Sequence, residues 1–123
     1  MKFTKTHEWL RLEGAKGTMG ITQHAQEEIS DVVFVELPKV GRAVKQGEEM
    51  AVVESVKAAF SIYAPVSGTI TEVNEPLSKD PALINRSPYE QGWIAVLDVK
   101  TPAEADQLLD QAKYEEWVKG GGH

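Results

Sequence analysis

Short β-rich segments separated by glycine fill the middle of this 123-residue chain. Gly41, Gly47 and Gly68 stand between runs of β-branched and aromatic residues, at places where a small barrel or sandwich has to turn. Strands that recur about every 8 to 12 residues, with turn signals between them, are typical of a sandwich or barrel rather than of βαβ units. We therefore expect a mainly β fold with short helices at its periphery.

The expected strands follow from these runs. Residues 31–37 form a particularly strong candidate, and residues 32–35 within it are continuously apolar. A continuous apolar run predicts a strand that is buried on both faces. The other expected strands span residues 6–12, 18–21, 49–54, 59–63, 69–73 and 92–99.

Capping residues predict where the short helices begin. Thr22 is a suitable N-cap for a helix over residues 23–29. Thr101 is followed three residues later by Glu104, which is the spacing of a capping box, so a second helix is expected to open there. A further short helix is expected over residues 114–119.

Lys57 lies between two of the expected strands, residues 49–54 and 59–63. If these strands form a hairpin, the lysine stands at its tip, with the amine in water and open to an acylating enzyme. That is the geometry a carrier protein needs for a swinging prosthetic arm. A lysine in this position can equally be an ordinary solvated surface residue.

Charge and composition exclude several classes of function. The chain has 13 Lys and Arg against 19 Asp and Glu, a net charge of −6, which argues against nucleic acid as a partner. It has no cysteine, so disulfides, thiol nucleophiles and Cys-ligated zinc are excluded. Its three histidines, His7, His24 and His123, do not have metal-ligand spacing. Neither a phosphate-binding glycine motif nor a catalytic constellation supports a stand-alone enzyme.

The length fits one domain, which we expect over residues 1–119, followed by a flexible tail over residues 120–123. No apolar run is long enough to span a bilayer, and the first residues lack a hydrophobic signal core. We therefore expect no membrane partner and a cytoplasmic protein, or a mature chain already processed for the mitochondrial matrix.

The glycine pattern continues into the hairpin. Small or apolar residues recur every third position from residue 41 to residue 53, and the sequence Glu54-Ser55-Val56-Lys57-Ala58 follows. This spacing resembles the biotinyl/lipoyl attachment module, in which a hairpin presents one lysine for amide linkage to the cofactor. Biotin carriers typically have methionine on both sides of that lysine, whereas Val56 and Ala58 stand here.

The form of the hairpin is similar to that of the H-protein family of the glycine cleavage system, and matches extend over about residues 2–118. They include residues 7–9, 20–22, 31–38, 83–85, 87–89 and 92–94. The resemblance implies a lipoyl-type barrel-sandwich hybrid of two antiparallel sheets, with short helices near the N-terminal region and at the C-terminus.

The resemblance also implies a function. Lipoic acid would be attached to Lys57 by a lipoate-attaching enzyme. The arm would carry the aminomethyl group of glycine from a pyridoxal-phosphate glycine decarboxylase to a tetrahydrofolate-dependent aminomethyltransferase, and dihydrolipoyl dehydrogenase would reoxidise it. The chain would then be a non-catalytic carrier and most simply a monomer. Two alternatives stay open: a relay that donates lipoyl groups to other complexes, and, less favoured, a biotin carrier.

Further site residues are expected around the arm. Glu54, Ser55, Val56 and Ala58 form the attachment motif that the modifying enzyme would recognise. Because the loaded arm would end in a cationic amine, nearby carboxylate and hydroxyl groups are candidates to receive it in a cleft. Those candidates are Glu8 and Thr6, with His24 as a weaker one, while Ser61 stands near the position where the family often has an acid.

Overall fold

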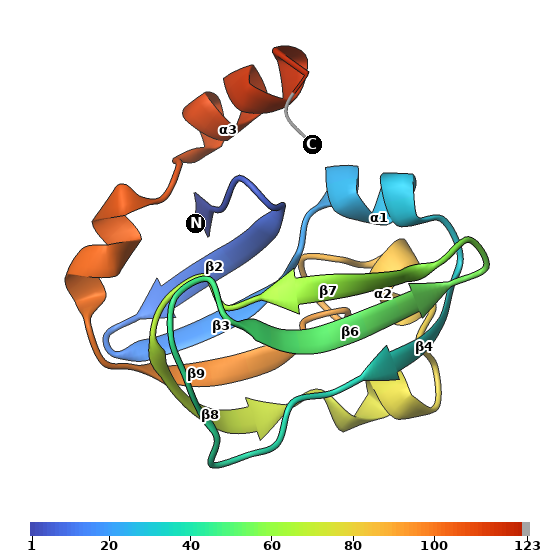
Figure 1. The fold of residues 1–123 in the computed structure, drawn as a ribbon, viewed down its shortest axis with the longest axis horizontal. Coiled ribbons are helices and arrows are strands. Elements are labelled where there is room, and N and C mark those ends of the chain that lie inside the picture. The colour runs from blue at the N-terminus through green and yellow to red at the C-terminus, as the bar shows by residue number, and fades with distance from the viewer. Residues whose placement is uncertain (122–123) are drawn as a thin grey trace.

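The computed structural model describes residues 1–121 and shows two antiparallel sheets packed face to face (Figure 1). The larger sheet has the strand order β1-β2-β3-β9-β8-β5, and the smaller sheet has the order β4-β6-β7. The expected mainly β fold with peripheral short helices is confirmed, as an open sandwich rather than a closed barrel. The strands described are β1 (Lys2–Phe3), β2 (Glu8–Glu13), β3 (Lys16–Ile21), β4 (Val32–Glu36), β5 (Ala43–Val44), β6 (Glu49–Ser55), β7 (Ala59–Tyr63), β8 (Gly68–Val73) and β9 (Ala95–Val99).

The helices described are α1 (Gln23–Ile29), α2 (Leu83–Arg86) and α3 (Gln111–Lys119), with two 3₁₀ segments, η1 (Glu75–Ser78) and η2 (Pro102–Gln107). In Figure 1, α1 and α3 lie at the border of the sandwich, and α2 lies behind β6 and β7. Within residues 1–121, no helix has both the length and the apolar character needed to cross a bilayer.

The main core lies between the two sheets. Side chains from the larger sheet, including Leu10, Met19 and Leu97, pack with Val53 and Ile62 of the smaller one, and all are fully or almost fully buried. A second cluster joins α3 to the N-terminal strands: the ring of Phe3 stacks on that of Tyr114 at 4.7 Å. The two rings thus join β1 to α3.

The helix over residues 23–29 is confirmed together with its cap. The Thr22 hydroxyl accepts a hydrogen bond from the Ala25 backbone N–H at 3.1 Å, which satisfies one of the free donors of the first turn. Ala25 and Ile29 turn their side chains into the main core, so this short helix is stabilised by packing as well as by its cap.

The expected capping box at Thr101 is wrong. Thr101 makes no side-chain cap, and residues 102–107 form a 3₁₀ segment. The Glu104 carboxylate instead accepts two hydrogen bonds from Ser67, from its backbone N–H at 2.7 Å and its hydroxyl at 2.9 Å. A partner distant in sequence has displaced the local cap. Helix α3 begins later, where the Asp110 side chain accepts from the Lys113 N–H.

The expectation that residues 31–37 are buried on both faces is also wrong. β4 is an edge strand, and only Val32 and Val35 of its apolar residues are buried. A bulge lies between Val32 and Phe34, because Val32 pairs with Ser55 while Phe34 pairs with the adjacent Glu54. Such a bulge adds a residue to one strand and re-aims its side chains. Two successive apolar residues, Val33 and Phe34, are consequently exposed.

Two of the three glycines expected at turns adopt the left-handed conformation, with φ of 93° at Gly41 and 86° at Gly47. Gly68 serves a different purpose as the first residue of β8. A Cβ atom there would lie 2.5 Å from the carbonyl oxygen of Asp98, so glycine allows β8 and β9 to approach closely.

Several element boundaries differ from expectation. The first expected strand, residues 6–12, is observed as Glu8–Glu13, and the last, residues 92–99, starts only at Ala95. Strands β1 and β5 were not expected; each is only two residues long and too short to produce a periodic signal. Of the expected tail, residues 122–123 lie outside the described residues.

Candidate functional site

The hairpin between β6 and β7 ends in a turn that its own residues hold in place. The Ser55 backbone N–H donates to the Ala58 carbonyl at 2.9 Å, and the Ser55 hydroxyl oxygen accepts from the Lys57 N–H at 3.0 Å. The Val56 N–H donates to the Asp31 carbonyl at 3.1 Å, which fastens the tip to the segment before β4. A serine side chain that bonds backbone groups two and three residues ahead stabilises a tight turn.

Lys57 lies at this tip with its side chain exposed. Its Nζ donates to the backbone carbonyl of Glu28 in α1 at 3.0 Å. Among residues 1–121, no carboxylate lies within ion-pair distance of this amine. A single exposed hydrogen bond to a carbonyl is easily exchanged for water, so an enzyme can reach the nitrogen. The tip therefore fits a group attached through an amide.

The other residues of the expected attachment motif surround Lys57. Glu54 lies at the end of β6, where it pairs across the sheet with Ala59 on one side and Phe34 on the other. Glu54, Val56 and Ala58 are exposed, whereas Ser55 is half-buried. Ser55 is thus the member of the motif whose side chain builds the turn, while the other three present their side chains to solvent.

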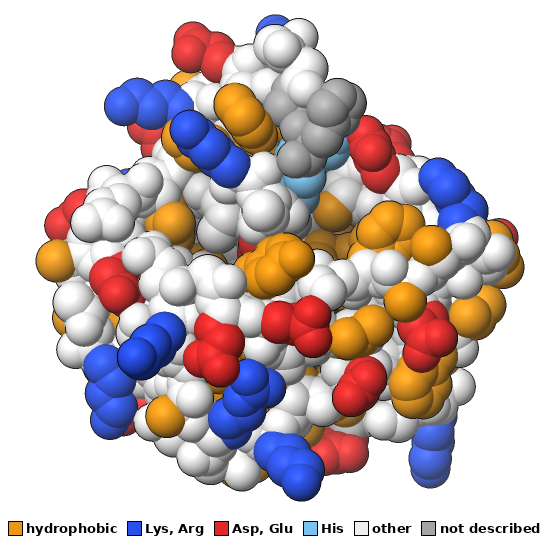
Figure 2. Space-filling view, viewed as in Figure 1, with side chains coloured by type: hydrophobic (Ala, Val, Ile, Leu, Met, Phe, Trp, Pro, Cys, Tyr) orange, Lys and Arg blue, Asp and Glu red, His pale blue; other side chains and the backbone are white. Residues whose placement is uncertain are grey.

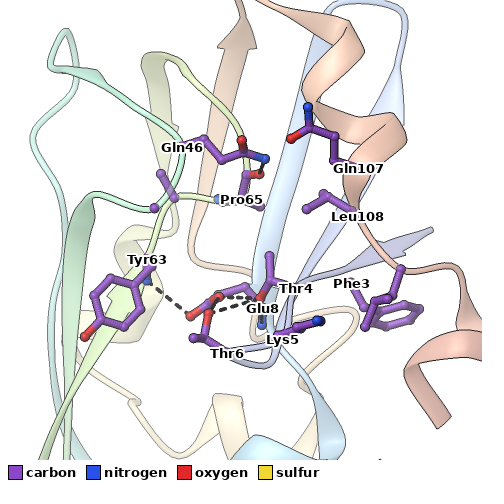
Figure 3. A pocket seen from close by; sticks show the side chains of 13 residues that line it. Phe3, Thr4, Lys5, Thr6, Glu8, Gln46, Tyr63, Pro65, Gln107 and Leu108 are labelled. Carbon is purple, nitrogen blue, oxygen red and sulfur yellow. Dashed lines mark hydrogen bonds between the residues drawn. The ribbon is translucent and has the colours of Figure 1, made fainter. Parts of the chain in front are cut away.

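Glu8 lies at the start of β2 and is 1% exposed. The hydroxyls of Thr4 and Thr6 both donate to Oε1 at 2.5 Å, and the Tyr63 N–H donates to Oε2 at 3.2 Å (Figure 3). The carboxylate is therefore held from two sides, by the loop that leads into β2 and by the end of β7. These contacts fix the direction in which the carboxyl group points.

Burial raises the pKa of the Glu8 carboxyl above its ordinary value, and the hydrogen bonds from Thr4, Thr6 and Tyr63 offset part of this rise. The ionised carboxylate thus loses more hydration than its neutral donors restore. A cation brought beside it would stabilise the charged form.

Two neighbouring cavities lie on the side of β7 that Glu8 faces. One, of about 220 Å³, is lined by Glu8, Thr6, Tyr63 and residues of the 3₁₀ segment η2 and the loop after it (Figure 3). The other, also about 220 Å³, lies between α1 and β7 and includes Thr6, Phe60 and Glu28 in its wall. Thr6 borders both cavities, and Glu28 is the residue whose carbonyl binds Lys57. We call these two cavities the β7 cleft.

The structure brings Glu8 and Thr6 together but places His24 elsewhere. His24 lines a separate cavity of about 430 Å³ between α1 and α3, and its Nε2 lies 3.2 Å from the Glu28 carboxylate. Between the two regions stands His7, whose ring centroid is 4.7 Å from that of His24. His24 is therefore not part of the β7 cleft.

A buried hydrogen-bond network supports the residue next to Glu8. His7 has a positive φ of 73°, which is uncommon for a side chain of its size. Its Nδ1 lies 2.7 Å from the Tyr114 hydroxyl, which is also 2.7 Å from the Thr22 hydroxyl. Burial raises the pKa of Tyr114 to about 12, so the phenol stays neutral. The network ties α3, the cap of α1 and the turn before β2 to one another.

Sequence reasoning missed several contributors to the cleft. The Tyr63 N–H and the Glu28 carbonyl are backbone groups, which leave no signal in the sequence. Thr4 gave no strand signal either, because Thr4 and Thr6 lie in the turn before β2, where the two-residue alternation of a strand does not apply. Ser61 stands near the position where the family often has an acid. Its hydroxyl donates to the carboxylate of Glu49 on the neighbouring strand at 2.5 Å.

Comparison with known proteins identifies the family. The model of the glycine cleavage H-protein family matches residues 1–121. A glycine cleavage system H protein of Symbiobacterium thermophilum is 52% identical over 98% of this chain and 94% of its own length. The mitochondrial glycine cleavage system H protein 2 of Arabidopsis thaliana is 50% identical over 97% of this chain and 76% of its own length.

A solved structure agrees with these sequence matches. The crystal structure of a glycine cleavage system H protein from Mycobacterium marinum superposes with a TM-score of 0.85 at 36% identity, covering 98% of this chain and 95% of that one. The matches extend over both sheets and the terminal segments as well as the hairpin. The chain belongs to the glycine cleavage H-protein family.

Proposed function

We propose that this protein is the lipoyl carrier of a glycine cleavage system and that Lys57 is its attachment residue. The observation that supports this most directly is the exposed Lys57 amine on a turn that Ser55 holds in place. The carrier takes no catalytic part of its own. Its residues present the arm and shelter what the arm carries between the decarboxylase, the aminomethyltransferase and dihydrolipoyl dehydrogenase.

Attachment requires one reaction at Lys57. The neutral Nζ attacks the carbonyl carbon of an activated lipoyl group. The C–N bond forms, the activating group leaves with its electron pair, and the nitrogen gives up a proton. When bound, the lipoyl group supplies a cyclic disulfide for exchange and redox chemistry. Because the chain contains no cysteine, no thiol of its own can form a mixed disulfide with that group.

The β7 cleft fits the far end of such an arm. Glu8 offers a desolvated carboxylate whose ionised form would be stabilised by a neighbouring cation. Thr6 and Thr4 hold that carboxylate from the loop, and the Tyr63 N–H holds it from β7. We propose that Glu8, positioned by Thr6, receives the cationic amine of the carried one-carbon unit and keeps water away from it. His24 is not among the residues that line the two cavities of this cleft.

A reconstituted reaction tests the proposal. The protein is prepared with and without lipoate and combined with the three other components of glycine cleavage, glycine, tetrahydrofolate and NAD. We expect NADH to form only with the modified carrier. Equal NADH formation with the unmodified carrier would overturn the proposed function. Transfer of the lipoyl group from this protein to another complex, with no glycine-dependent NADH, would show a lipoyl relay instead.

A further inference from the structure

An apolar patch lies on the outer side of the smaller sheet beside the hairpin tip. Its members are Val33, Phe34 and Val56, whose exposed fractions are 55%, 50% and 68%. Val33 and Phe34 are both exposed because the bulge in β4 interrupts the regular alternation of the strand. Val56 immediately precedes Lys57. We call these three residues the tip patch.

The tip patch is continuous with the surface around Lys57. Phe34 pairs with Glu54, which lies three residues before the lysine, and the Val56 N–H is bonded to the Asp31 carbonyl two residues before Val33. Hydrophobic side chains interspersed with acidic ones cover β6 and β4 in Figure 2. Clustered exposed apolar residues on a small protein commonly mark a surface that another protein covers.

The border of the patch is acidic. Glu36 on β4, Glu54 on β6 and Asp31 just before β4 are all exposed. A second copy of this chain would bring the same carboxylates against these, and the chain already carries a net charge of −6. Like charges placed together oppose association. The charge pattern therefore fits a different protein, whose contact surface has an apolar centre and a rim of Lys and Arg.

We propose that the tip patch is the docking surface for the enzyme that acylates Lys57. This inference rests on the proposed function. Enzymes that act on the far end of an arm can work at a distance from its root. The acylating enzyme has to bring a carbonyl carbon within bonding distance of Nζ, so its surface must cover the residues that flank the tip. Of the partners of this carrier, it is the one that geometry forces onto Val56 and its neighbours.

Phe34→Ser tests the apolar centre. Lipoylation by a lipoate–protein ligase supplied with lipoate and ATP is followed by intact mass, with the carrier concentration varied. We expect the KM for the carrier to rise about tenfold with kcat nearly unchanged, as when one aromatic anchor of an interface is removed. Val40→Ser is the matched control, since Val40 is 60% exposed and lies beyond the other end of β4. Its KM should stay within about twofold of the wild-type value.

Glu36→Lys tests the acidic border independently. We expect a raised KM and a weaker dependence of lipoylation on salt, because one attractive charge has become repulsive. Thermal midpoints of all variants show that each is folded. Wild-type KM values for both Phe34→Ser and Glu36→Lys would overturn the inference.

The outcomes separate this inference from the proposed function. If the wild-type protein is not modified on Lys57 at all, the proposed function fails. If it is modified and the variants are modified at the same rate, only the docking surface is wrong. An unchanged lipoylation KM with a raised KM of the decarboxylase for the modified carrier would assign the patch to the decarboxylase. A concentration-dependent dimer that Phe34→Ser abolishes would assign it to a second copy.

Discussion

The hairpin tip and the surroundings of Glu8 hold their functional groups in opposite ways. Lys57 is exposed and has a single hydrogen bond to a carbonyl, whereas Glu8 is 1% exposed and accepts hydrogen bonds from Thr4, Thr6 and the Tyr63 N–H. At the tip it is the backbone that is fixed, by Ser55, while the Lys57 side chain has only that one exposed hydrogen bond. At Glu8 the side chain itself is fixed.

Under the proposed function, this difference corresponds to two demands on one carrier. The attachment residue has to be reached by a separate enzyme and then swing, so a free amine on a firm turn serves it. The residue that receives the carried amine has to exclude water, so a held carboxylate in a cavity serves it, even though burial raises its pKa. Both regions meet β7, which begins beside the tip and ends at Tyr63.

The largest effect is expected from Lys57→Arg. Arginine keeps the charge but offers no amine that can be acylated, so lipoylation and glycine-dependent NADH formation should fall to background. Lys39→Arg is the matched control, since Lys39 is also exposed. Because residue 57 is exposed, the thermal midpoint should not change. Full glycine cleavage by Lys57→Arg would contradict the assignment of Lys57 as the attachment residue.

Glu8→Gln tests whether the buried carboxylate protects the carried one-carbon unit. It should leave the lipoylation rate unchanged and shorten the lifetime of the carried one-carbon unit about tenfold, since one charge-assisted hydrogen bond is worth about 1.4 kcal/mol or more. The measurement is the decay of radiolabel from the carrier after the decarboxylase is removed. A lifetime equal to that of the wild type would exclude Glu8 from the site.

The titration of Glu8 gives a second test of the same carboxyl. Because its pKa in the folded state is raised above 4.5, the folded protein holds this proton more tightly than the unfolded chain does. That stabilisation is complete below pH 4.5 and is lost as the pH rises through the folded pKa. The free energy of unfolding of the wild type should therefore fall relative to Glu8→Gln above pH 4.5, as urea titrations measure. A difference between the two proteins that is independent of pH would contradict the raised pKa.

Tyr114→Phe tests whether the buried side of the comparison depends on α3. The change deprives His7 and Thr22 of a shared buried partner, and we expect a loss of about 1–3 kcal/mol in the free energy of unfolding. Tyr63→Phe is the control, because the Tyr63 hydroxyl makes no hydrogen bond to the rest of residues 1–121. Equal urea midpoints for the two variants would show that the network adds nothing.

Ser55→Ala should have the smallest effect. The turn loses the oxygen that accepts from the Lys57 N–H, which costs about 0.5–1 kcal/mol at an accessible site. We expect lipoylation to slow only a few-fold, because the backbone bond from Ser55 to Ala58 remains. Ser78→Ala, at an exposed position outside the hairpin, is the control. A total loss of lipoylation would mean that Ser55 contacts the modifying enzyme directly.

Local sequence signals predicted the parts of the structure that local forces decide. The hairpin around Lys57 and the helix capped by Thr22 are held by contacts within a few residues, so the local residue types predict both elements. Glu104 shows the opposite case: its local spacing indicated a capping box, but Ser67, 37 residues away, offers it two hydrogen bonds. Which partner Glu104 bonds is decided by tertiary packing, and the local sequence does not predict it.

The candidate site divides in the same way. Lys57, Glu8 and Thr6 were predicted because side-chain chemistry and a family resemblance pointed to them. The Tyr63 N–H and the Glu28 carbonyl were not, because every residue carries these groups and only the fold decides which ones meet. The bulge that exposes Phe34 was not predicted either, since a continuous apolar run has the same sequence pattern in a regular buried strand and in a bulged one.

The most direct test of the account is the mass of the tryptic peptide that contains residue 57, after incubation with lipoate, ATP and a lipoate–protein ligase. Trypsin does not cleave after an acylated lysine, so we predict one peptide spanning residues 46–79 with the mass of a single added lipoyl group. Complete cleavage into unmodified peptides 46–57 and 58–79, with the added mass on another lysine or on none, would contradict it.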